Sequence, residues 1–527
     1  MPTSFSTSSV AAYAKARPYQ LAALLLFLVV AAVYYVRFLG ELPTGVHTWA
    51  QSDRYSLALM FYDYGFQFLK PRTHSLLSIG GITGVEFPLQ PYLAALGGLV
   101  FGRNAIVGVF RALDVLMAVV GFYYLFRLVY ERTGHVAAGL LPGAFLLASP
   151  VFAFYAGNFA PDPFSLSLTF VAYYYWLRFF DDHRLRDLLL TLALMTLASL
   201  VKTTSALHFM GLLGITGVYL LLQPTVLGLR QRLYVLAAVL ASLGALVAFY
   251  LHNQALNETY QSIVFRASLN PIDTPEVLHS VLYYINRDLR LEYGTPTHGR
   301  ILLGCVVLFL AFSRRLVRRY WPLFALLGAA LLAAVVFWKA MGAGLGVHDY
   351  HMICVLGPPT VLLLVLALLG LGNLRGWLRH LSSAGLGFLL VFLLVKGYTR
   401  LGQRMSDDYL PFSAYYTHPW MRGGAAEMVK AEVPASASVL VLNEDAPNVA
   451  LVYFDRRGLC WKPSNLAELS MHDLQTYMSS EHLEYLVMSK ATYEQLQHLH
   501  PQFPAEFTLV GWKPALVFQR RNLQYPW

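Results

Sequence analysis

The chain has 527 residues, of which 57% are hydrophobic and only 13% carry a charge. Soluble globular proteins carry about 25% charged residues, so this composition excludes an ordinary soluble protein and places most of the chain in lipid. The net charge of +10 does not indicate nucleic-acid binding, because the arginines cluster in short loops between apolar segments, as in membrane proteins.

Eleven apolar segments are expected to cross the membrane as helices. The first, residues 21–36, follows Lys15 and Arg17. It lacks a small-residue cleavage site and precedes many further spans, which favours a retained helix over a signal peptide. The remaining spans are expected at residues 104–127, 135–156, 163–179, 186–201, 205–222, 233–251, 299–313, 319–338, 351–371 and 381–397.

The basic loops indicate how these spans are oriented. They contain Arg127/Arg132, Arg178/Arg184/Arg186, Arg230/Arg232, Arg314/Arg315/Arg318/Arg319 and Arg375/Arg379. All five loops are cytoplasmic, with the N-terminus, if the short segment 89–102 does not cross the bilayer. Its prolines, Pro88 and Pro91, and its length favour an interfacial helix. A twelfth span there would put every later basic loop outside.

The chain changes character after the last span, so we expect two domains, a transmembrane domain over residues 1–400 and an extracytoplasmic soluble α/β domain over 401–527. Helices are expected at 425–433, 466–478 and 492–499, and strands at 439–442 and 485–488. No glycine-rich phosphate loop follows either strand. The charged residues at the junction, Arg400, Arg404, Asp407 and Asp408, are expected to be solvated beside the membrane.

The polar loop after the first span carries two acidic residues outside the membrane. Asp53, followed by Arg54 and Tyr55, could act as a general base, although Ser52 and Asp53 are also good helix caps. Glu86 precedes a proline-started helix and is either solvated there or binds a divalent cation or a substrate.

The apolar run between these two acidic residues, residues 56–61, is expected to form a helix along the membrane surface.

Two more charged residues are expected near the outer ends of spans. Asp162 lies between two prolines, where a helix N-terminus also tolerates an acidic residue. Lys202 is the one charged residue between Leu188 and Gln223. With its neighbouring hydroxyls it suits a lipid phosphate, or it extends to the interface as lysines near span ends do.

A short polar motif, His348-Asp349-Tyr350-His351, precedes a span that contains Pro358 and Pro359. Two histidines three residues apart could share a helix face and bind a metal. Two ligands are few for a metal site, so His348, Tyr350 and His351 are better candidates for substrate contacts, with a simple interfacial polar cluster as the alternative. One topology places this motif, Lys202 and the acidic residues on the same side of the membrane.

The order of these motifs resembles the large membrane glycosyltransferases of the C-type fold, over roughly residues 18–400. The most similar are bacterial relatives of the protein O-mannosyltransferases and of the lipid A aminoarabinose transferase. The matching residues are Asp53-Arg54-Tyr55 after the first span and Glu86-Phe-Pro-Leu89 before the interfacial helix, with shorter matches at Pro161-Asp162-Pro163, Lys202 and the His348–His351 motif.

The resemblance implies an enzyme that transfers a sugar from a polyprenyl phosphate outside the cytoplasm. Asp53 would be the catalytic carboxylate, Glu86 would assist the acceptor or a cation, and Lys202 would contact the donor phosphate. The remaining substrate contacts would be Arg54, Tyr55, Asp162, His348, Tyr350 and His351. The chain departs from the family pattern at Arg54, where an acidic residue is frequent, and at Phe87, where lysine is common.

We therefore expect an inverting glycosyltransferase in a bacterial inner or cell membrane, with a lipid-linked sugar and the bilayer as partners and no nucleic acid. The acceptor is open among lipids, glycans and proteins, and a divalent metal remains an option, with Glu86 as its best candidate ligand. The alternatives are a transporter or flippase of lipid-linked sugars, a polysaccharide polymerase or ligase, and a non-catalytic scaffold. A transporter should place ionisable groups at mid-membrane and show related halves, and neither feature is apparent here.

Overall fold

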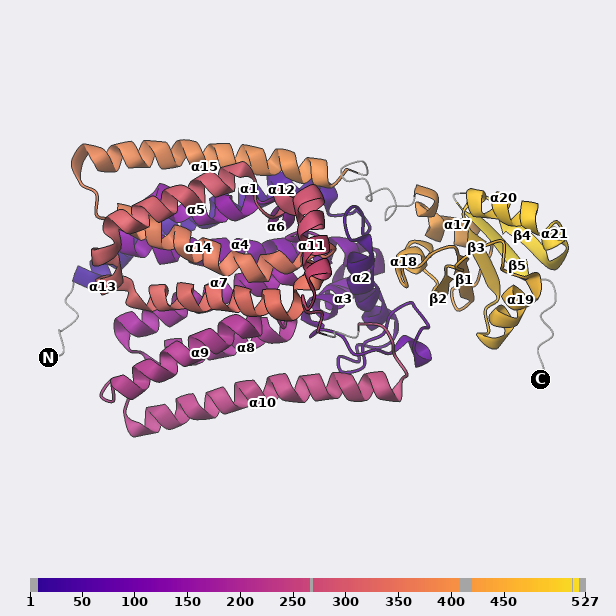
Figure 1. Ribbon diagram of the computed structural model, residues 1–527, viewed down its shortest axis with the longest axis horizontal. Helices are drawn as coiled ribbons and strands as arrows, with labels where there is room; N and C mark the ends of the chain where they lie inside the picture. The colour runs from indigo at the N-terminus through magenta and orange to yellow at the C-terminus, as the bar shows by residue number, and fades with distance from the viewer. Residues whose placement is uncertain (1–7, 266–268, 407–418, 514, 521–527) are drawn as a thin grey trace. The chain divides into compact units, whose positions relative to one another are not determined.

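The computed structural model describes residues 8–265, 269–406, 419–513 and 515–520 (Figure 1). The chain forms two compact units. The helical unit comprises Met1–Leu39, Arg111–Tyr250 and Ala267–Arg404, and the sheet unit comprises Gly40–Phe110, Leu251–Arg266 and Met405–Trp527. The loop after the first helix and a short central segment therefore fold with the C-terminal residues.

Helices of very different lengths make up the helical unit, and α4 and α10 each extend beyond the boundary of this unit. They are α1 (Ser8–Tyr35), α4 (Ile106–Thr133), α5 (Val136–Leu147), α6 (Pro150–Tyr155), α7 (Pro161–Asp182), α8 (Leu185–Val201), α9 (Ser205–Leu222), α10 (Leu229–Thr259), α11 (Pro275–Tyr284), α12 (Arg290–Tyr293), α13 (Pro296–Met341), α14 (His351–Leu371) and α15 (Gly376–Arg404). Among the described residues, eight helical segments are long and apolar enough to cross a membrane. The expected count of eleven spans is thus not confirmed.

Proline explains where the helices depart from the expected spans. The span expected at residues 135–156 is broken between α5 and α6, because Pro150 has no N–H and disfavours helical geometry at Ser149. Ser149 instead caps α6 through the Phe152 amide. The spans expected at 299–313 and 319–338 run together in α13, which has non-helical backbone angles at Tyr320, two residues before Pro322.

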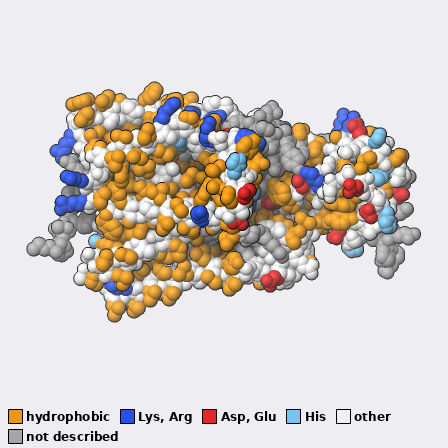
Figure 2. Space-filling model, in the orientation of Figure 1, with side chains coloured by type: hydrophobic (Ala, Val, Ile, Leu, Met, Phe, Trp, Pro, Cys, Tyr) orange, Lys and Arg blue, Asp and Glu red, His pale blue; other side chains and the backbone are white. Residues whose placement is uncertain are grey.

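Several basic loops gather at one end of the helical unit. Arg132, at the end of α4, pairs with Asp181 at the end of α7. Arg379, near the start of α15, donates to the Gly134 carbonyl at 3.2 Å. Hydrophobic side chains cover the flanks of the long helices (Figure 2), as expected of a surface that faces lipid tails. The contacts agree with the sequence prediction that these loops share one side.

The sheet unit contains a five-stranded sheet in the order β2-β1-β3-β5-β4. β1 is parallel to β2 and β3, whereas β5 is antiparallel to β3 and β4. Its strands are β1 (Ser438–Leu442), β2 (Arg457–Trp461), β3 (Tyr485–Met488), β4 (Phe507–Gly511) and β5 (Leu516–Arg520), and its helices are α2 (Thr48–Asp63), α3 (Leu89–Phe101), α17 (Gly424–Lys430), α18 (Val449–Phe454), α19 (Met471–Ser480), α20 (Lys490–Leu499) and α21 (Phe503–Glu506). Strands β1 and β3 lie where the sequence predicts them, while β2, β4, β5 and α18 were not predicted.

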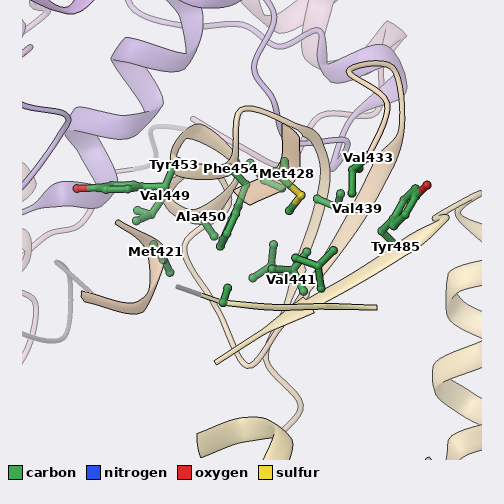
Figure 3. Close-up of a cluster of buried hydrophobic side chains, with 14 of the residues drawn as sticks. Met421, Met428, Val433, Val439, Val441, Val449, Ala450, Tyr453, Phe454 and Tyr485 are labelled. Carbon is green, nitrogen blue, oxygen red and sulfur yellow. The ribbon is translucent and has the colours of Figure 1, made fainter. Parts of the chain in front are cut away.

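A buried apolar cluster fixes α18 against the sheet (Figure 3). Val449 and Phe454 of α18 pack in the same cluster as Val439 and Val441 of β1. The edge strand β2 is covered by residues 74–76, which lie between α2 and α3. The Leu76 amide donates to the Gly458 carbonyl at 2.8 Å, and the Gly458 amide donates to the His74 carbonyl at 3.1 Å. Pairing of this kind protects an otherwise open sheet edge.

The two helices of the first loop differ from each other in burial. The helix expected at residues 56–61 is present within α2, but its apolar side chains are buried and do not lie along the membrane surface. Leu57 is fully buried and packs with Phe61, Val85 and Ala95. In contrast, α3 is short and exposes apolar side chains such as Val100 and Phe101, as an interfacial helix would.

Candidate functional site

Asp53 lies inside α2 and does not cap it. The helix begins at Thr48, after His47 in a left-handed conformation at φ 55°. The Thr48 hydroxyl donates to the Gly45 carbonyl at 2.7 Å, and the Gln51 amide donates to the Thr44 carbonyl at 2.8 Å. These bonds hold the entry to the helix, so the alternative interpretation of Asp53 as an N-cap is wrong.

The Asp53 carboxylate is buried, and an amide from the C-terminal segment binds it. Asp53 is only 6% exposed, and Nδ2 of Asn448 donates to the Oδ1 atom of Asp53 at 2.8 Å. Burial raises the pKa of Asp53 to about 7, against the opposing effects of Asn448, the Arg54 charge and Trp49. A carboxylate that titrates near neutral pH is suited to general-base chemistry.

The orientation of the Asn448 amide follows from its other partners. Its Oδ1 accepts from the Ser75 amide at 3.0 Å and from the Ser56 hydroxyl at 3.4 Å. A backbone N–H can only donate, so the oxygen of Asn448 must point to Ser75 and its NH₂ group to Asp53.

A Ser–His–Asp arrangement lies beside this amide. Ser56 Oγ is 2.8 Å from Nδ1 of His74, and His74 Nε2 is 3.7 Å from Asp455 Oδ1. Burial lowers the pKa of His74, against the opposing effect of Asp455. Ser56 is fully buried and His74 is 1% exposed, and both side chains belong to the hydrogen-bond network around Asn448.

The far end of this network is charged. Arg103 makes paired hydrogen bonds to Asp455 at 2.9 and 2.8 Å and to Asp63 at 2.8 and 2.7 Å. Burial alone would raise the pKa of Asp455, but the nearby His74 and Arg103 outweigh it and hold that pKa well below its usual range. Asn448 and Asp455 flank α18, so both ends of that helix bind the segment that contains α2.

Arg54 and Glu86 form an ion pair with each other. Arg54 also lies 6.0 Å from the centre of the Phe265 ring, and Tyr55 is buried beside it. A cation at Glu86 would compete with the guanidinium. Among the described residues, no three His, Cys, Asp or Glu side chains gather in a way that could hold a metal.

A second polar cluster lies in the helical unit, at the opposite end of α7 from the basic loops. Asp162 is in the first turn of α7 and is fully buried. Lys202 ends α8, and its Nζ lies 3.3 Å from Asp162 and 5.3 Å from the centre of the Tyr350 ring. Lys202 is buried and does not extend into solvent. The carboxylate and the aromatic ring stabilise its charge in this position.

The His348–His351 motif lies next to this lysine. The Tyr350 hydroxyl is 3.2 Å from His348 Nδ1, and the two histidine rings meet edge to face with centroids 5.6 Å apart. Because α14 begins at His351, His348 precedes the helix and the pair does not share a helix face. The metal interpretation, which the sequence already made the weaker one, therefore lacks a shared helix face, whereas the aromatic cluster remains suited to substrate contact.

Arg404 corrects another expectation, because it is fully buried and not solvated beside the membrane. Its guanidinium binds the carboxylates of Glu292 and Asp349, and the Tyr155 hydroxyl donates to Asp349 at 2.8 Å. This network ties the end of α15 to the turn that carries the His348–His351 motif. Asp407 and Asp408 lie outside the described residues.

The structure thus gathers the predicted residues in two groups. Asp53, Arg54, Tyr55 and Glu86 belong to the sheet unit, and Asp162, Lys202, His348, Tyr350 and His351 belong to the helical unit. The sequence reasoning missed Asn448, Glu292 and the role of Arg404. The one local signal at Asn448 is its position before an apolar helix, which does not indicate a partner 395 residues away.

Comparison with known proteins gives one family and several solved structures. Residues 86–251 match the dolichyl-phosphate-mannose-protein mannosyltransferase family. Curated protein sequences give no match.

Two crystal structures of ArnT from Cupriavidus metallidurans are similar to this chain. The structure with undecaprenyl phosphate bound gives a TM-score of 0.55 at 14% identity, and the apo structure gives 0.56 at 13%. Each match covers 94% of this chain and 97% of the ArnT chain. The mycobacterial arabinofuranosyltransferase AftD gives a TM-score of 0.54 at 13% identity, over 95% of this chain and 41% of its own. The predicted fold class is confirmed: the chain is a helical membrane protein with the C-type fold of membrane glycosyltransferases and a small C-terminal sheet.

Proposed function

We propose that the protein is an inverting membrane glycosyltransferase that moves a sugar from a polyprenyl phosphate to an extracytoplasmic acceptor. The observation that carries this proposal is Asp53, a buried carboxylate with its pKa near 7, on a fold shared with ArnT and AftD. The ArnT structure with undecaprenyl phosphate supports a lipid-linked donor here.

The proposed reaction is a single displacement. An acceptor hydroxyl or amine attacks the anomeric carbon and gives its proton to Asp53. The bond between that carbon and the phosphate oxygen breaks, and the oxygen leaves with the electron pair. Lys202, whose role rests on the family resemblance, stabilises the negative charge of the departing phosphate.

The proposed location follows from the distribution of charge. The arginine-rich ends of the helices face the cytoplasm, together with the N-terminus. Lys202, Asp162 and the His348–His351 motif, at the other ends, then face the outside, and so does the soluble domain expected over residues 401–527. Such an enzyme acts on acceptors that have already left the cytoplasm.

The test uses the purified protein in proteoliposomes with a panel of undecaprenyl-phosphate sugars and an envelope extract as the acceptor source. We expect release of undecaprenyl phosphate and labelling of an acceptor. Asp53→Asn should abolish both without loss of folded protein, whereas the exposed control Asp445→Asn should leave them unchanged. Undiminished transfer by Asp53→Asn would remove Asp53 from this role.

Lys202 provides a second, separate test. Lys202→Met should lower kcat/KM for the donor by about 10- to 100-fold, because a charged hydrogen bond contributes about 1.5–3 kcal/mol, and Lys202→Arg should retain part of the activity. Movement of intact donor across the bilayer, with no release of lipid phosphate from any sugar, would instead favour a flippase.

A further inference from the structure

The C-terminal segment contributes a side chain to the immediate surroundings of Asp53. Asn448 donates directly to the Asp53 carboxylate at 2.8 Å, and both residues are buried. In the described structure this bond joins two residues of the same compact unit. The C-terminal segment is thus more than a separate cap, because it supplies a group that touches the proposed base.

Asn448 is itself held in a fixed orientation. Its amide oxygen is bound by the Ser75 amide and the Ser56 hydroxyl, and it immediately precedes α18. The helix is in turn fixed by its apolar residues against the sheet (Figure 3). The Tyr453 hydroxyl donates to the Pro43 carbonyl at 2.8 Å, which binds α18 to the chain just before α2. A side chain locked in this way can hold its partner in one geometry.

The groups that act on Asp53 are few. From its own helix, Arg54 and Trp49 favour the charged form, and Asn448 does the same from the start of α18. The charge of Arg54 is shared with Glu86. His74 lies beyond Ser56, and Asp455 and Arg103 lie beyond His74. Asn448 is therefore the neutral donor through which the C-terminal segment reaches the carboxylate.

We propose that Asn448 is a positioning residue for Asp53, so that the C-terminal segment completes the catalytic group. The amide holds one carboxylate oxygen in place and stabilises the ionised form, which is the form able to accept a proton. Without Asn448, Asp53 would be present but less often ionised and less well oriented. This inference rests on the role proposed for Asp53.

The experiment compares Asn448→Ala and Asn448→Asp with the wild type in the full-length protein. Transfer from the undecaprenyl-phosphate sugar that is turned over best is measured across pH, and kcat and KM are separated. Infrared difference spectroscopy follows protonation of the carboxyl group whose band disappears in Asp53→Asn. The surface variant Asn465→Ala is the matched control, since Asn465 is exposed and its side chain hydrogen-bonds to Glu468 and to the Ala467 amide.

Loss of a hydrogen bond to the charged form should raise the pKa of Asp53, and with it the acid limb of the pH profile of kcat, by about one pH unit. The ionised fraction at pH 7 then falls from about one half to about one tenth, so kcat at pH 7 should fall about fivefold, with little change in donor KM. The infrared titration should move by the same amount. Asn448→Asp, which has the same shape, should move both further because two carboxylates then face each other. It also replaces Asn448→Ala if that variant does not fold.

A final variant separates position from charge. The double variant Asp53→Asn/Asn448→Asp re-forms the hydrogen bond, but its carboxylate is now on residue 448. It should therefore recover the thermal stability that Asn448→Asp loses, but it should not recover sugar transfer. An unchanged pH profile and infrared titration in both Asn448 variants would overturn the inference, even if Asp53→Asn is inactive. Active Asp53→Asn would instead overturn the proposed function, so the two failures are distinguishable.

Discussion

Replacing Asp53 with asparagine should make the protein more stable while it removes activity. Asparagine has the shape of a protonated aspartate and can still accept the hydrogen bond from Asn448. In the folded protein burial raises the pKa of Asp53 to about 7, whereas an aspartate in an unfolded chain has a pKa of about 3.9. The folded state therefore binds the proton more tightly than the unfolded state does.

The sign and size of the effect follow from linkage. Between these two pKa values the folded state carries more protons, so the free energy of unfolding falls as pH rises from about 4 to about 7 and then stays level. A difference of about three pKa units corresponds to ~4 kcal/mol. Asp53→Asn does not lose this stability as pH rises, because asparagine does not titrate. Its free energy of unfolding should therefore exceed that of the wild type by nearly zero at pH 4, by about 1.5 kcal/mol at pH 5 and by ~4 kcal/mol at pH 8.

Thermal unfolding of the purified protein, followed by tryptophan fluorescence at pH 5 and pH 8, measures this difference. Asp53→Asn should raise Tm by a few degrees at pH 8 and by clearly less at pH 5. Asp445→Asn is the control, because Asp445 is a solvent-exposed carboxylate paired with Lys462 and its loss should change Tm little at either pH. An equal gain at both pH values, or a loss at pH 8, would refute the reasoning.

Two other substitutions test the packing. Arg404→Met should destabilise the folded protein by about 3–5 kcal/mol, because Glu292 and Asp349 would be left as buried, uncompensated carboxylates. Thermal unfolding measures this, adding Glu292→Gln should recover part of the loss, and an unchanged Tm would show that the carboxylates do not need the arginine. Gly458→Ala should separate β2 from β1, because a Cβ atom would lie 1.8 Å from the Val439 carbonyl oxygen. Limited proteolysis should then cut the C-terminal segment sooner than in the wild type, and equal resistance of the two proteins would contradict this.

The sequence predicted the parts of the fold that depend on local composition. Apolar segments and basic loops defined most of the long helices, because lipid requires long apolar helices and the arginines gather in the short loops where those helices end. Strands β1 and β3 were visible as short apolar runs. β2 and β5 were not, because charged and small residues such as Arg457, Gly458 and Arg520 interrupt their apolar pattern and their places are set by pairing with neighbouring strands.

The breaks within the expected spans are caused by prolines, which can be read in the sequence but which a hydrophobicity pattern alone does not show. Pro150 separates α5 from α6, and Tyr320 marks a kink two residues before Pro322 in α13. Arg404 was misjudged for a different reason. A charge after an apolar segment normally meets solvent, and only the two acidic partners from distant parts of the chain make its burial favourable.

At the candidate site, the residue types that could act were apparent from the sequence: an acidic residue after the first span, a lysine at the end of another, and a polar motif before a late span. Their surroundings came from folding. It buried Asp53 within α2, joined Arg54 to Glu86 and set Lys202 between Asp162 and Tyr350. It also brought Asn448 to Asp53 across 395 residues. Hydrophobicity and charge are properties of each residue, whereas a carboxylate's pKa and orientation depend on groups that only folding brings into contact.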